Sequence, residues 1–436
     1  MLHESPVGFS CLVPPVDRLP LLVDTILSPH LSLAQGVPMP RKRKSTSTSI
    51  FSDDFGAPIA TPPPASRVTK PSANPNKVQL ETAIVYCQGH FGGIGGKTAN
   101  GLVRHSEKYE ILSIIDSENS GQDAGKVLDG EPSGIPVYED FDEALMYTSE
   151  VPDYFIFGIS PASGKLSSHE RQLILRAIDH GMNIVNGLHE FLNDDPQFVA
   201  ACAKSKVVIR DVQQPRDKKD LRVFSGRIAD VTCPRIAILG TDCAIGKRTT
   251  ATILTRALNE RGIKAVMIGT GQTGLIQGAR YGMVLDAIPA QFCAGELEAK
   301  IIEAFENEEP DVIVIEGQGS LSHPASSTSS FILRGSCPQG VVLQHAPCRE
   351  HRCDFDDIPM PDPGAEIHLI ETFALTKVIG LTLNHENMTD AQVSSSIKSY
   401  EKKFGVPVTD ALTRPPERLV EMVLSAFPEI EASLLV

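Results

Sequence analysis

The sequence comprises 436 residues, of which 41% are hydrophobic, and it carries a formal net charge of −14. Its length allows two or three domains, and its acidic character argues against a general binder of nucleic acid or of anionic membranes. No apolar run is long enough to cross a bilayer, so we predict no transmembrane helix. Nine cysteines without a paired framework are typical of reduced thiols, and we therefore expect a cytoplasmic protein.

The first 78 residues differ in composition from the rest of the chain. They contain 13 of the 32 prolines, and eight Lys and Arg against five Asp and Glu. Such a segment buries little apolar surface, so we predict a disordered extension over residues 1–78. Its basic cluster Arg41–Lys44 could serve as a nuclear-import signal, but a solvated cluster in a tail is the simpler interpretation.

Residues 79–222 alternate short apolar runs with a helical pattern. The helix is expected over residues 168–181, and the strands at 81–89, 109–116, 153–159, 182–187 and 206–212. Strands that alternate with helices indicate βαβ units and a parallel sheet. We therefore predict an α/β fold with a Rossmann-like N-terminal domain over residues 79–222.

A glycine-rich loop at residues 89–98 follows the first of these strands, and Asp116 ends the second. This is the layout of a dinucleotide-binding fingerprint. However, the glycines do not give a clean G-x-G-x-x-G, and Phe91 stands where a phosphate loop needs its first glycine. A tight strand-to-helix turn is the alternative. Residues 133–145, "SGIPVYEDFDEAL", are similar to the CoA-binding domains of acyl-CoA ligases, which leaves a CoA-type ligand open.

A second βαβ series begins at residue 234. Strands are expected at 234–240, 264–270, 311–316, 340–347 and 377–384, helices at 247–262, 294–309, 390–403 and 416–426, and a loop at 271–278. This pattern predicts a C-terminal domain over residues 223–436 with a parallel sheet of the P-loop NTPase type.

The stretch "ILGTDCAIGKRTT" at residues 238–250 lies between the first strand and helix of this series. A Walker A loop has four residues between its glycines and Ser or Thr after its lysine, whereas five residues separate Gly240 from Gly246, and Arg248 follows Lys247. We still predict a phosphate cradle, because a glycine-rich turn and a lysine at a helix N-terminus favour anions. The predicted phosphate-binding residues are Gly240, Thr241, Cys243, Gly246, Lys247, Thr249 and Thr250.

Glu316 ends the apolar strand that follows the loop along the chain. Acids at such strand ends hold Mg²⁺ or its water in P-loop proteins. If Mg²⁺ is bound, we expect Glu316 and Thr249 as its ligands, with Thr250 as the alternative hydroxyl.

"GTDCAIGK" together with "VIEGQG" resembles the dethiobiotin synthetase branch of P-loop proteins, whose loops also have the longer spacing. Over "GTDCAIGKRTTA", "GTGQTG", "EGQGSLSHPA" and "VVLQHAPCR", the chain resembles the bacterial D-glutamate N-acetyltransferases, two-domain P-loop proteins, across about residues 80–430. The resemblance implies an enzyme that moves an acetyl group from acetyl-CoA to the α-amine of a D-amino acid. The alternatives are an ATP- and Mg²⁺-dependent kinase or ligase, and a non-catalytic nucleotide-binding regulatory protein.

Acetyl transfer needs a base for the amine proton, and the candidates are Asp242, His323 and His345. A substrate carboxylate favours a bidentate arginine, for which Arg349 is the first choice and Arg334 the second. The loop after Glu316 follows the carboxyl end of a strand, where ligands bind in open α/β sheets. Its predicted substrate-binding residues are Ser320 and Ser322.

Cys243 is expected near a helix N-terminus, a setting that lowers the pKa of a thiol. It could accept the acetyl group in a two-step route, although a small residue that fits a tight loop explains it more simply. The run "HAPCREHRC" at residues 345–353 does not have the usual spacing of a zinc site. As partners we expect an amino-acid substrate and a second copy of the chain in a homo-oligomer, with no nucleic acid and no membrane.

Overall fold

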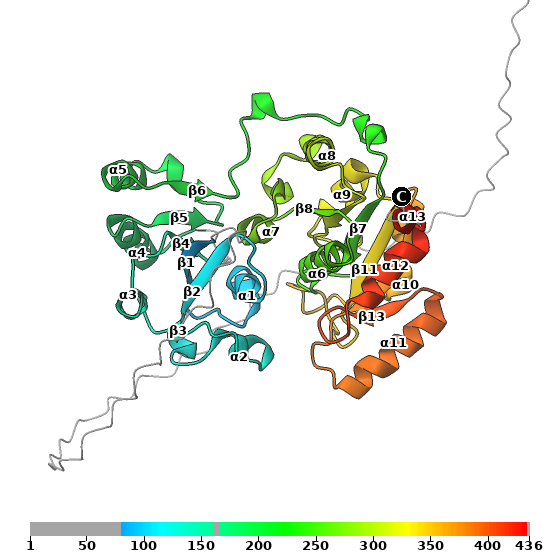
Figure 1. Cartoon of the computed structure of the whole chain (residues 1–436), viewed down its shortest axis with the longest axis horizontal. Coiled ribbons are helices and arrows are strands. Elements are labelled where there is room, and N and C mark those ends of the chain that lie inside the picture. Colours follow the sequence, from blue (N-terminus) through cyan, green and yellow to red (C-terminus); the bar gives the residue numbers. More distant parts are fainter. Residues whose placement is uncertain (1–79, 160–164, 434–436) are drawn as a thin grey trace, which may run out of the picture. The chain divides into compact units, whose positions relative to one another are not determined.

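The computed structural model describes residues 80–159 and 165–433, which contain two parallel β-sheets flanked by helices (Figure 1). The predicted extension over residues 1–78 and the basic cluster Arg41–Lys44 lie outside these ranges. The predicted α/β class is confirmed for both sheets.

The first sheet has six parallel strands in the order β3-β2-β1-β4-β5-β6. This is the strand order of a Rossmann fold. Its strands are β1 (Glu81–Tyr86), β2 (Tyr109–Ile115), β3 (Val137–Tyr138), β4 (Tyr154–Phe157), β5 (Asn183–Asn186) and β6 (Ile209–Asp211). Its helices are α1 (Lys97–Arg104), α2 (Ala124–Asp129), α3 (Phe141–Met146), α4 (Ser168–Asp179) and α5 (Pro196–Ser205).

The second sheet has seven parallel strands in the order β13-β12-β11-β7-β10-β8-β9. They are β7 (Arg235–Gly240), β8 (Ala265–Gly269), β9 (Tyr281–Gly282), β10 (Val312–Glu316), β11 (Gly340–His345), β12 (Lys377–Leu383) and β13 (Val408–Asp410). Its helices are α6 (Lys247–Glu260), α7 (Gln272–Gln277), α8 (Ala290–Glu308), α9 (Thr328–Ser336), α10 (Pro363–Phe373), α11 (Asp390–Phe404), α12 (Glu417–Ala426) and α13 (Glu429–Ser433).

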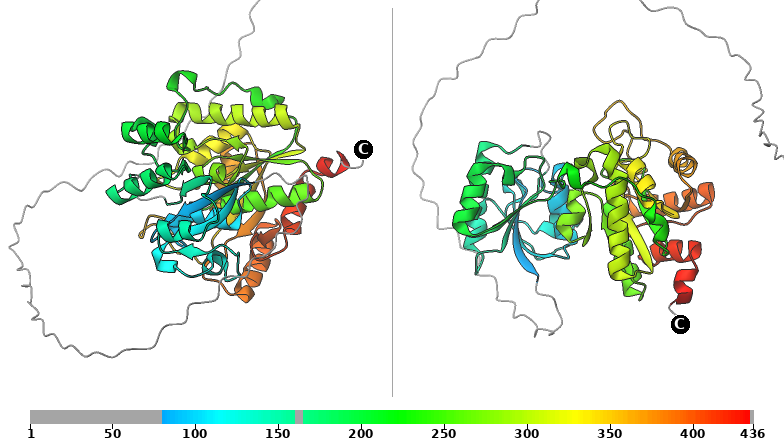
Figure 2. Two further views of the ribbon diagram at one scale, coloured as in Figure 1. Left: turned by 60° about the vertical axis from the view of Figure 1, so that its left-hand side comes forward. Right: turned by 90° about the horizontal axis from the view of Figure 1, so that it is seen from above.

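Helices cover both faces of each sheet (Figure 2). Alternate residues of β7 serve the two faces of the second sheet, because successive side chains of a strand point to opposite sides. Ile236 and Ile238 pack in a core with α6 and α12, whereas Ala237 and Leu239 pack in a core with α8 and α9. β7 is therefore buried on both faces, which explains its continuous apolar run.

One predicted loop is wrong, because residues 271–278 contain the short helix α7. Its glycines lower the intrinsic helix propensity, but contacts made elsewhere in the fold compensate. The Gln277 side-chain amide donates to the carbonyl oxygens of Gly101 and His105, and the hydroxyls of Thr273 and Thr98 lie 3.0 Å apart. The predicted helix at 294–309 also starts earlier, at Ala290.

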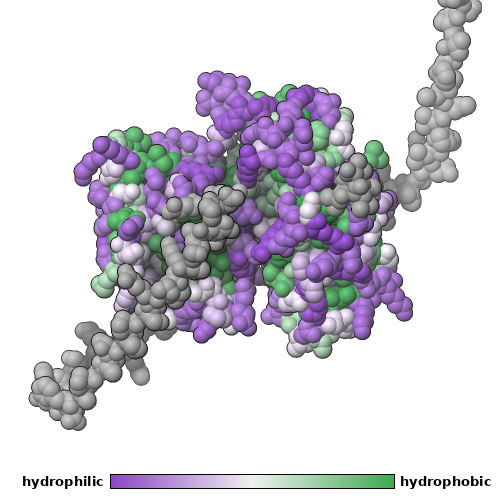
Figure 3. Space-filling model, viewed as in Figure 1, coloured by the Kyte–Doolittle hydropathy of each residue, from purple (hydrophilic) through white to green (hydrophobic). Residues whose placement is uncertain are grey.

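Hydrophilic side chains dominate the face of the molecule drawn in Figure 3. Within residues 80–159 and 165–433, none of the helices is both long and apolar enough to span a bilayer.

Candidate functional site

The candidate site lies where β7, β10 and β11 end, at one edge of the second sheet. β7 is the middle strand of the three. The strands β10 and β8 lie on one side of it, and β11, which comes later in the chain, lies on the other side, so the strand order reverses at β7. Such reversal points are where open α/β sheets bind ligands. The predicted residues after Gly240, after Glu316 and at the end of β11 are thus brought to a common edge.

The loop after β7 has the tight turn that the glycines predict. Gly246 has φ +101° and Ala244 has φ +49°, both in the left-handed region where a glycine costs little. At Gly240 an added Cβ would lie 2.9 Å from the Lys247 side chain. The turn therefore depends on glycine at both ends, and it leads directly into α6.

Lys247 is buried, and its ammonium donates to the backbone carbonyl oxygen of Asp242. Burial lowers the pKa of this ammonium to about 8, although the neighbouring Cys243 and Asp242 oppose the shift. A buried cation held over a turn of backbone amides is suited to bind phosphate oxygens.

Arg349 does not present a free guanidinium to a substrate. Its Nε and Nη2 donate to Glu386 at 2.7 and 2.8 Å, and its Nη1 donates to Asp242 Oδ2 at 2.9 Å. Nη1 and Nη2 also donate to the carbonyl oxygens of Cys243 and Ala244. All five N–H groups of the Arg349 guanidinium are therefore hydrogen-bonded, so Arg349 stabilises the conformation of the phosphate loop.

Arg334 is also placed away from the role predicted for it. It lies in the last turn of α9, which carries the chain back from the loop edge to the start of β11. Its guanidinium stacks on Phe373, 5.0 Å from the ring centroid, and donates to the Ser330 hydroxyl.

Asp242 and His323 form a buried pair beside the loop. His323 Nε2 lies 3.5 Å from Asp242 Oδ1, and neither atom has a hydrogen-bond partner in the described part of the chain. The backbone N–H of Ala325 points at His323 Nδ1 at 3.3 Å, which favours the tautomer with the proton on Nε2, facing the carboxylate. An imidazole oriented in this way by an acid can accept a proton at its other nitrogen, which here requires that the Ala325 N–H release Nδ1.

Cys243 Sγ, a carboxylate oxygen of Asp242 and a ring nitrogen of His323 lie within 4.8 Å of one another, which is the spacing of a metal site. However, the Ala325 N–H uses the lone pair of His323 Nδ1 and thereby favours a proton on Nε2, so neither nitrogen presents a free lone pair to a metal. Within the described residues no such group forms from His345, Cys348, His351 and Cys353.

The expectation that helix α6 lowers the pKa of Cys243 is wrong. The helix begins four residues later, at Lys247, and burial raises the pKa of the thiol, with the charge of Lys247 acting in the opposite direction. The protein therefore does not activate Cys243 as a thiolate nucleophile in this structure.

His345 lies at the end of β11, where its Nδ1 is 3.0 Å from the Thr241 hydroxyl. Burial lowers the pKa of its imidazole to about 4, and its ring contacts that of Tyr400 edge-on, with the centroids 5.7 Å apart. At neutral pH it is uncharged, and it supports the first residue of the phosphate loop.

Ser320 and Ser322 are held by two residues that the sequence analysis did not select. Arg352 donates to the hydroxyl oxygens of Ser320 at 3.0 Å and Ser322 at 2.7 Å. Glu366 accepts the Leu321 N–H at 2.7 Å and the Ser322 hydroxyl. The "HAPCREHRC" run could have drawn attention to Arg352, whereas Glu366 sits at the start of α10 without a local motif.

The predicted magnesium ligands differ in whether their oxygens already take part in hydrogen bonds with the protein. Glu316 is buried, and its Oε2 accepts the Thr270 N–H at 2.9 Å. Thr250 donates its hydroxyl to Gln344 Oε1 at 2.6 Å, whereas the partly buried Thr249 makes no side-chain hydrogen bond to the described residues.

The first glycine-rich loop uses its acid internally. Asp116 is buried, and it accepts the Gly89 N–H and the Asn119 amide, both at 2.6 Å. Each oxygen of Asp116 therefore accepts a hydrogen bond from the protein itself, one from the loop and one from Asn119.

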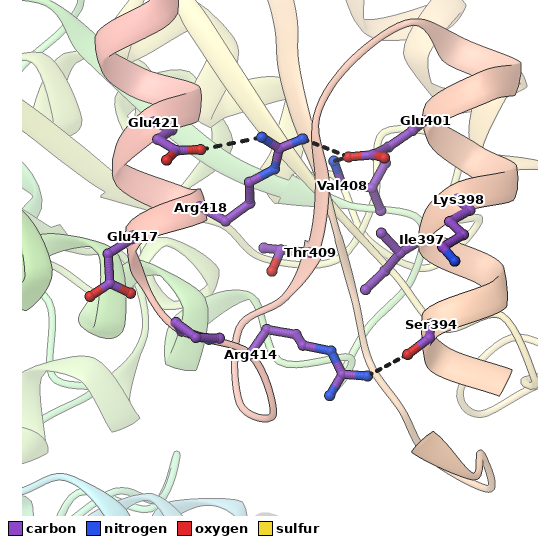
Figure 4. A pocket seen from close by; sticks show the side chains of 11 residues that line it. Ser394, Ile397, Lys398, Glu401, Val408, Thr409, Arg414, Glu417, Arg418 and Glu421 are labelled. Carbon is purple, nitrogen blue, oxygen red and sulfur yellow. Dashed lines mark hydrogen bonds and ion pairs between the residues drawn. The ribbon is translucent and has the colours of Figure 1, made fainter. Parts of the chain in front are cut away.

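A pocket of about 490 Å³ lies between α11 and α12 (Figure 4). Its arginines are already paired: Arg418 bonds to Glu401 and Glu421, and Arg414 bonds to Ser394. Lys398 and Glu417 also line the pocket, so its charged side chains balance at three positive and three negative.

Comparisons with known proteins agree with this architecture. Two family models match the chain, a Rossmann-like domain of unknown function (DUF1611_N) over residues 117–215 and a P-loop domain of unknown function (DUF1611_C) over residues 222–420. A solved DUF1611 family protein from Anabaena variabilis is 30% identical, with a TM-score of 0.73, and the match covers 79% of this chain and 99% of that one.

Two curated relatives carry the name D-glutamate N-acetyltransferase. The protein from Tritonibacter scottomollicae is 28% identical over 277 residues, which cover 61% of this chain and 79% of the relative. The protein from Pseudoalteromonas sp is 32% identical over 265 residues, which cover 59% and 77%. By these matches the chain belongs to the DUF1611 family, with its Rossmann-like N-terminal and P-loop C-terminal domains.

Proposed function

We propose that this protein is an acetyl-CoA-dependent N-acetyltransferase that acts on the α-amine of a D-amino acid such as D-glutamate. The names of the two curated relatives support an acetyltransferase. The observation that carries the proposal is the buried Asp242–His323 pair beside a phosphate loop. The loop supplies a cradle for the diphosphate of CoA, and the pair supplies a proton acceptor.

In this proposal the loop amides and the Lys247 ammonium bind the CoA diphosphate. The neutral amine attacks the thioester carbonyl, so that a C–N bond forms, the C–S bond breaks and the sulfur leaves as a thiolate. For this step the Ala325 N–H gives up its 3.3 Å contact with His323 Nδ1. Nδ1 then accepts the amine proton and later returns it to that thiolate. The Asp242 carboxylate faces Nε2 at 3.5 Å and stabilises the imidazolium that forms between these two steps.

The raised pKa of Cys243 favours direct transfer over an acetyl-enzyme. A thiol is a good nucleophile only as a thiolate, and burial keeps the Cys243 thiol protonated at neutral pH. The amine therefore attacks acetyl-CoA itself.

The test is to incubate the protein with acetyl-CoA, or with ATP and Mg²⁺, and a panel of D- and L-amino acids, following free thiol and phosphate. Thiol release that depends on a D-amino acid supports the proposal. Phosphate release without thiol would instead indicate an ATP-dependent kinase or ligase. Nucleotide binding without either product would indicate a regulatory protein.

A further inference from the structure

P-loop proteins usually hold Mg²⁺ through the Ser or Thr that follows the loop lysine. Here α6 begins with Lys247, and the next residue is Arg248. The residue that would bring a neutral hydroxyl to the metal is thus replaced by a long side chain with a fixed positive charge.

The two threonines that follow do not restore the missing ligand. Each residue of an α-helix is turned by about 100° from the one before it, so Thr249 and Thr250 leave α6 in different directions from Arg248. The Thr250 hydroxyl is already bonded to Gln344, whose Oε1 also accepts the Thr382 hydroxyl. Neither threonine occupies the position that faces the metal in a Walker A loop.

Glu316 was expected to bind the metal, but the positively charged side chains of Arg248 and Lys247 lie near its carboxylate. Burial raises the pKa of its carboxyl, while the positive charges of Arg248 and Lys247 lower it. One of its oxygens is bonded to the Thr270 N–H. The residues present therefore do not fit a magnesium ion at this loop.

The Arg248 guanidinium is available to bind an anion. It is partly buried, yet its side chain has no hydrogen bond and no ion pair with any residue of the described ranges. Its guanidinium packs against Gly101 of α1, where an added Cβ would lie 2.6 Å from Nη2. A guanidinium shielded from water without an acceptor is unfavourable unless a ligand supplies the acceptor, and no protein bond opposes its movement toward an anion in the loop.

We propose that Arg248 takes the place of Mg²⁺ as the counter-charge of the phosphate group in this loop, so that the cradle binds a diphosphate without a divalent cation. A guanidinium forms paired hydrogen bonds to phosphate oxygens, and its charge is permanent. The identification of that diphosphate as CoA rests on the proposed function, whereas metal-free phosphate binding does not.

The test measures binding of CoA and, separately, of inorganic pyrophosphate by calorimetry, in EDTA and in Mg²⁺. The natural protein is expected to have the same Kd in both buffers. Arg248→Ser restores the Walker A hydroxyl. It should bind both probes about 10- to 100-fold more weakly in EDTA, which is the loss of affinity expected when a hydrogen bond to a charged group is removed. Adding Mg²⁺ should recover much of this loss. Arg248→Lys, which keeps the charge but not the fork, should lie between the two.

Arg256→Ser is the matched control, because Arg256 lies on the same helix, is exposed and pairs with Glu260. It changes the net charge equally and should leave both Kd values unchanged, and circular dichroism checks that each variant is folded. Natural protein that binds only with Mg²⁺ or binds neither probe, or Arg248→Ser that binds as tightly as the natural protein in EDTA, would overturn the proposal. Metal-free binding of pyrophosphate without acetyl transfer would remove the proposed function and leave the role of Arg248 standing.

Discussion

The two glycine-rich loops of this protein occupy the same kind of position, each between the first strand and first helix of a parallel sheet. In the loop at residues 89–98, the nearby acid and amide are used internally: Asp116 binds the Gly89 N–H, and Asn100 binds Gly92 and Gly93. At the loop of residues 240–247, a buried acid, a buried histidine and a buried lysine meet, and two of their polar atoms lack hydrogen-bond partners among the described residues. The loop with this unused bonding capacity is therefore the candidate site.

Of the substitutions that test this difference between the two loops, the replacement of His323 should have the largest effect, because it should lower kcat. His323→Gln removes the proposed base, so we expect kcat to fall by about 10²- to 10⁴-fold, with the KM for acetyl-CoA little changed. Steady-state kinetics measure both values. His90→Gln in the first loop is the control. A kcat within tenfold of the natural value would remove His323 from the mechanism.

Arg349→Ala should destabilise the second loop strongly. It leaves the fully buried Asp242 carboxylate without its cation, and breaking a buried pair costs about 3–5 kcal/mol. The first domain offers a matched pair in Arg104 and Asp129, which are partly exposed, so Arg104→Ala should cost at most about 1 kcal/mol. Urea unfolding followed by circular dichroism compares the two, and equal losses would contradict the assignment of Arg349 as the clamp of the loop.

His345 should make the protein sensitive to acid. Its pKa is about 4 in the folded state against 6.5 for an unperturbed histidine, so the unfolded chain binds the extra proton as pH falls. This contribution to stability is complete above pH 6.5 and is lost between 6.5 and 4, by about 2–3 kcal/mol. Urea unfolding across that range should show a smaller loss for His345→Gln. Identical pH dependence in the two proteins would show that His345 is not the source.

Lys247 and Lys97 test the contrast directly, because each is the first residue of the helix after its loop. Lys247 is buried and Lys97 is exposed. Lys247→Met should weaken CoA binding by about 10- to 100-fold, the value of a hydrogen bond to a charged group. Lys97→Met should have a smaller effect, because the exposed Lys97 ammonium acts on the second loop only through its charge, as it does at Cys243. Calorimetric titration with CoA measures both, and a larger effect at Lys97 would move the phosphate site to the first loop.

Cys243→Ser should have the smallest effect. Because the structure does not activate the thiol, we expect acetyl transfer to change by about twofold at most. Radioactive acetyl-CoA should leave no label on the denatured protein. A labelled protein, together with an inactive serine variant, would establish the two-step route instead.

Much of the architecture could be predicted from the sequence, because the signals are local. Continuous apolar runs such as Arg235–Gly240 indicate strands buried on both faces, and glycines mark the turns. The positions of Gly246 and Lys247 identify the phosphate loop by the same local chemistry. Helix α7 escaped prediction because its stability comes from Gln277 and Thr273, whose partners lie more than a hundred residues earlier in the chain.

The two α/β domains, the phosphate loop and the charged residues around it could be predicted from the amino-acid sequence. How those charges are used depends on the three-dimensional fold, because the hydrogen-bond partners come from segments that are distant in the chain. It shows Arg349 fully bonded to Asp242, Glu386 and the loop, and it pairs Asp242 with His323. It also shows that Arg248, which in the sequence looked like a defect of the Walker motif, makes no hydrogen bond or ion pair with the residues that the structure describes.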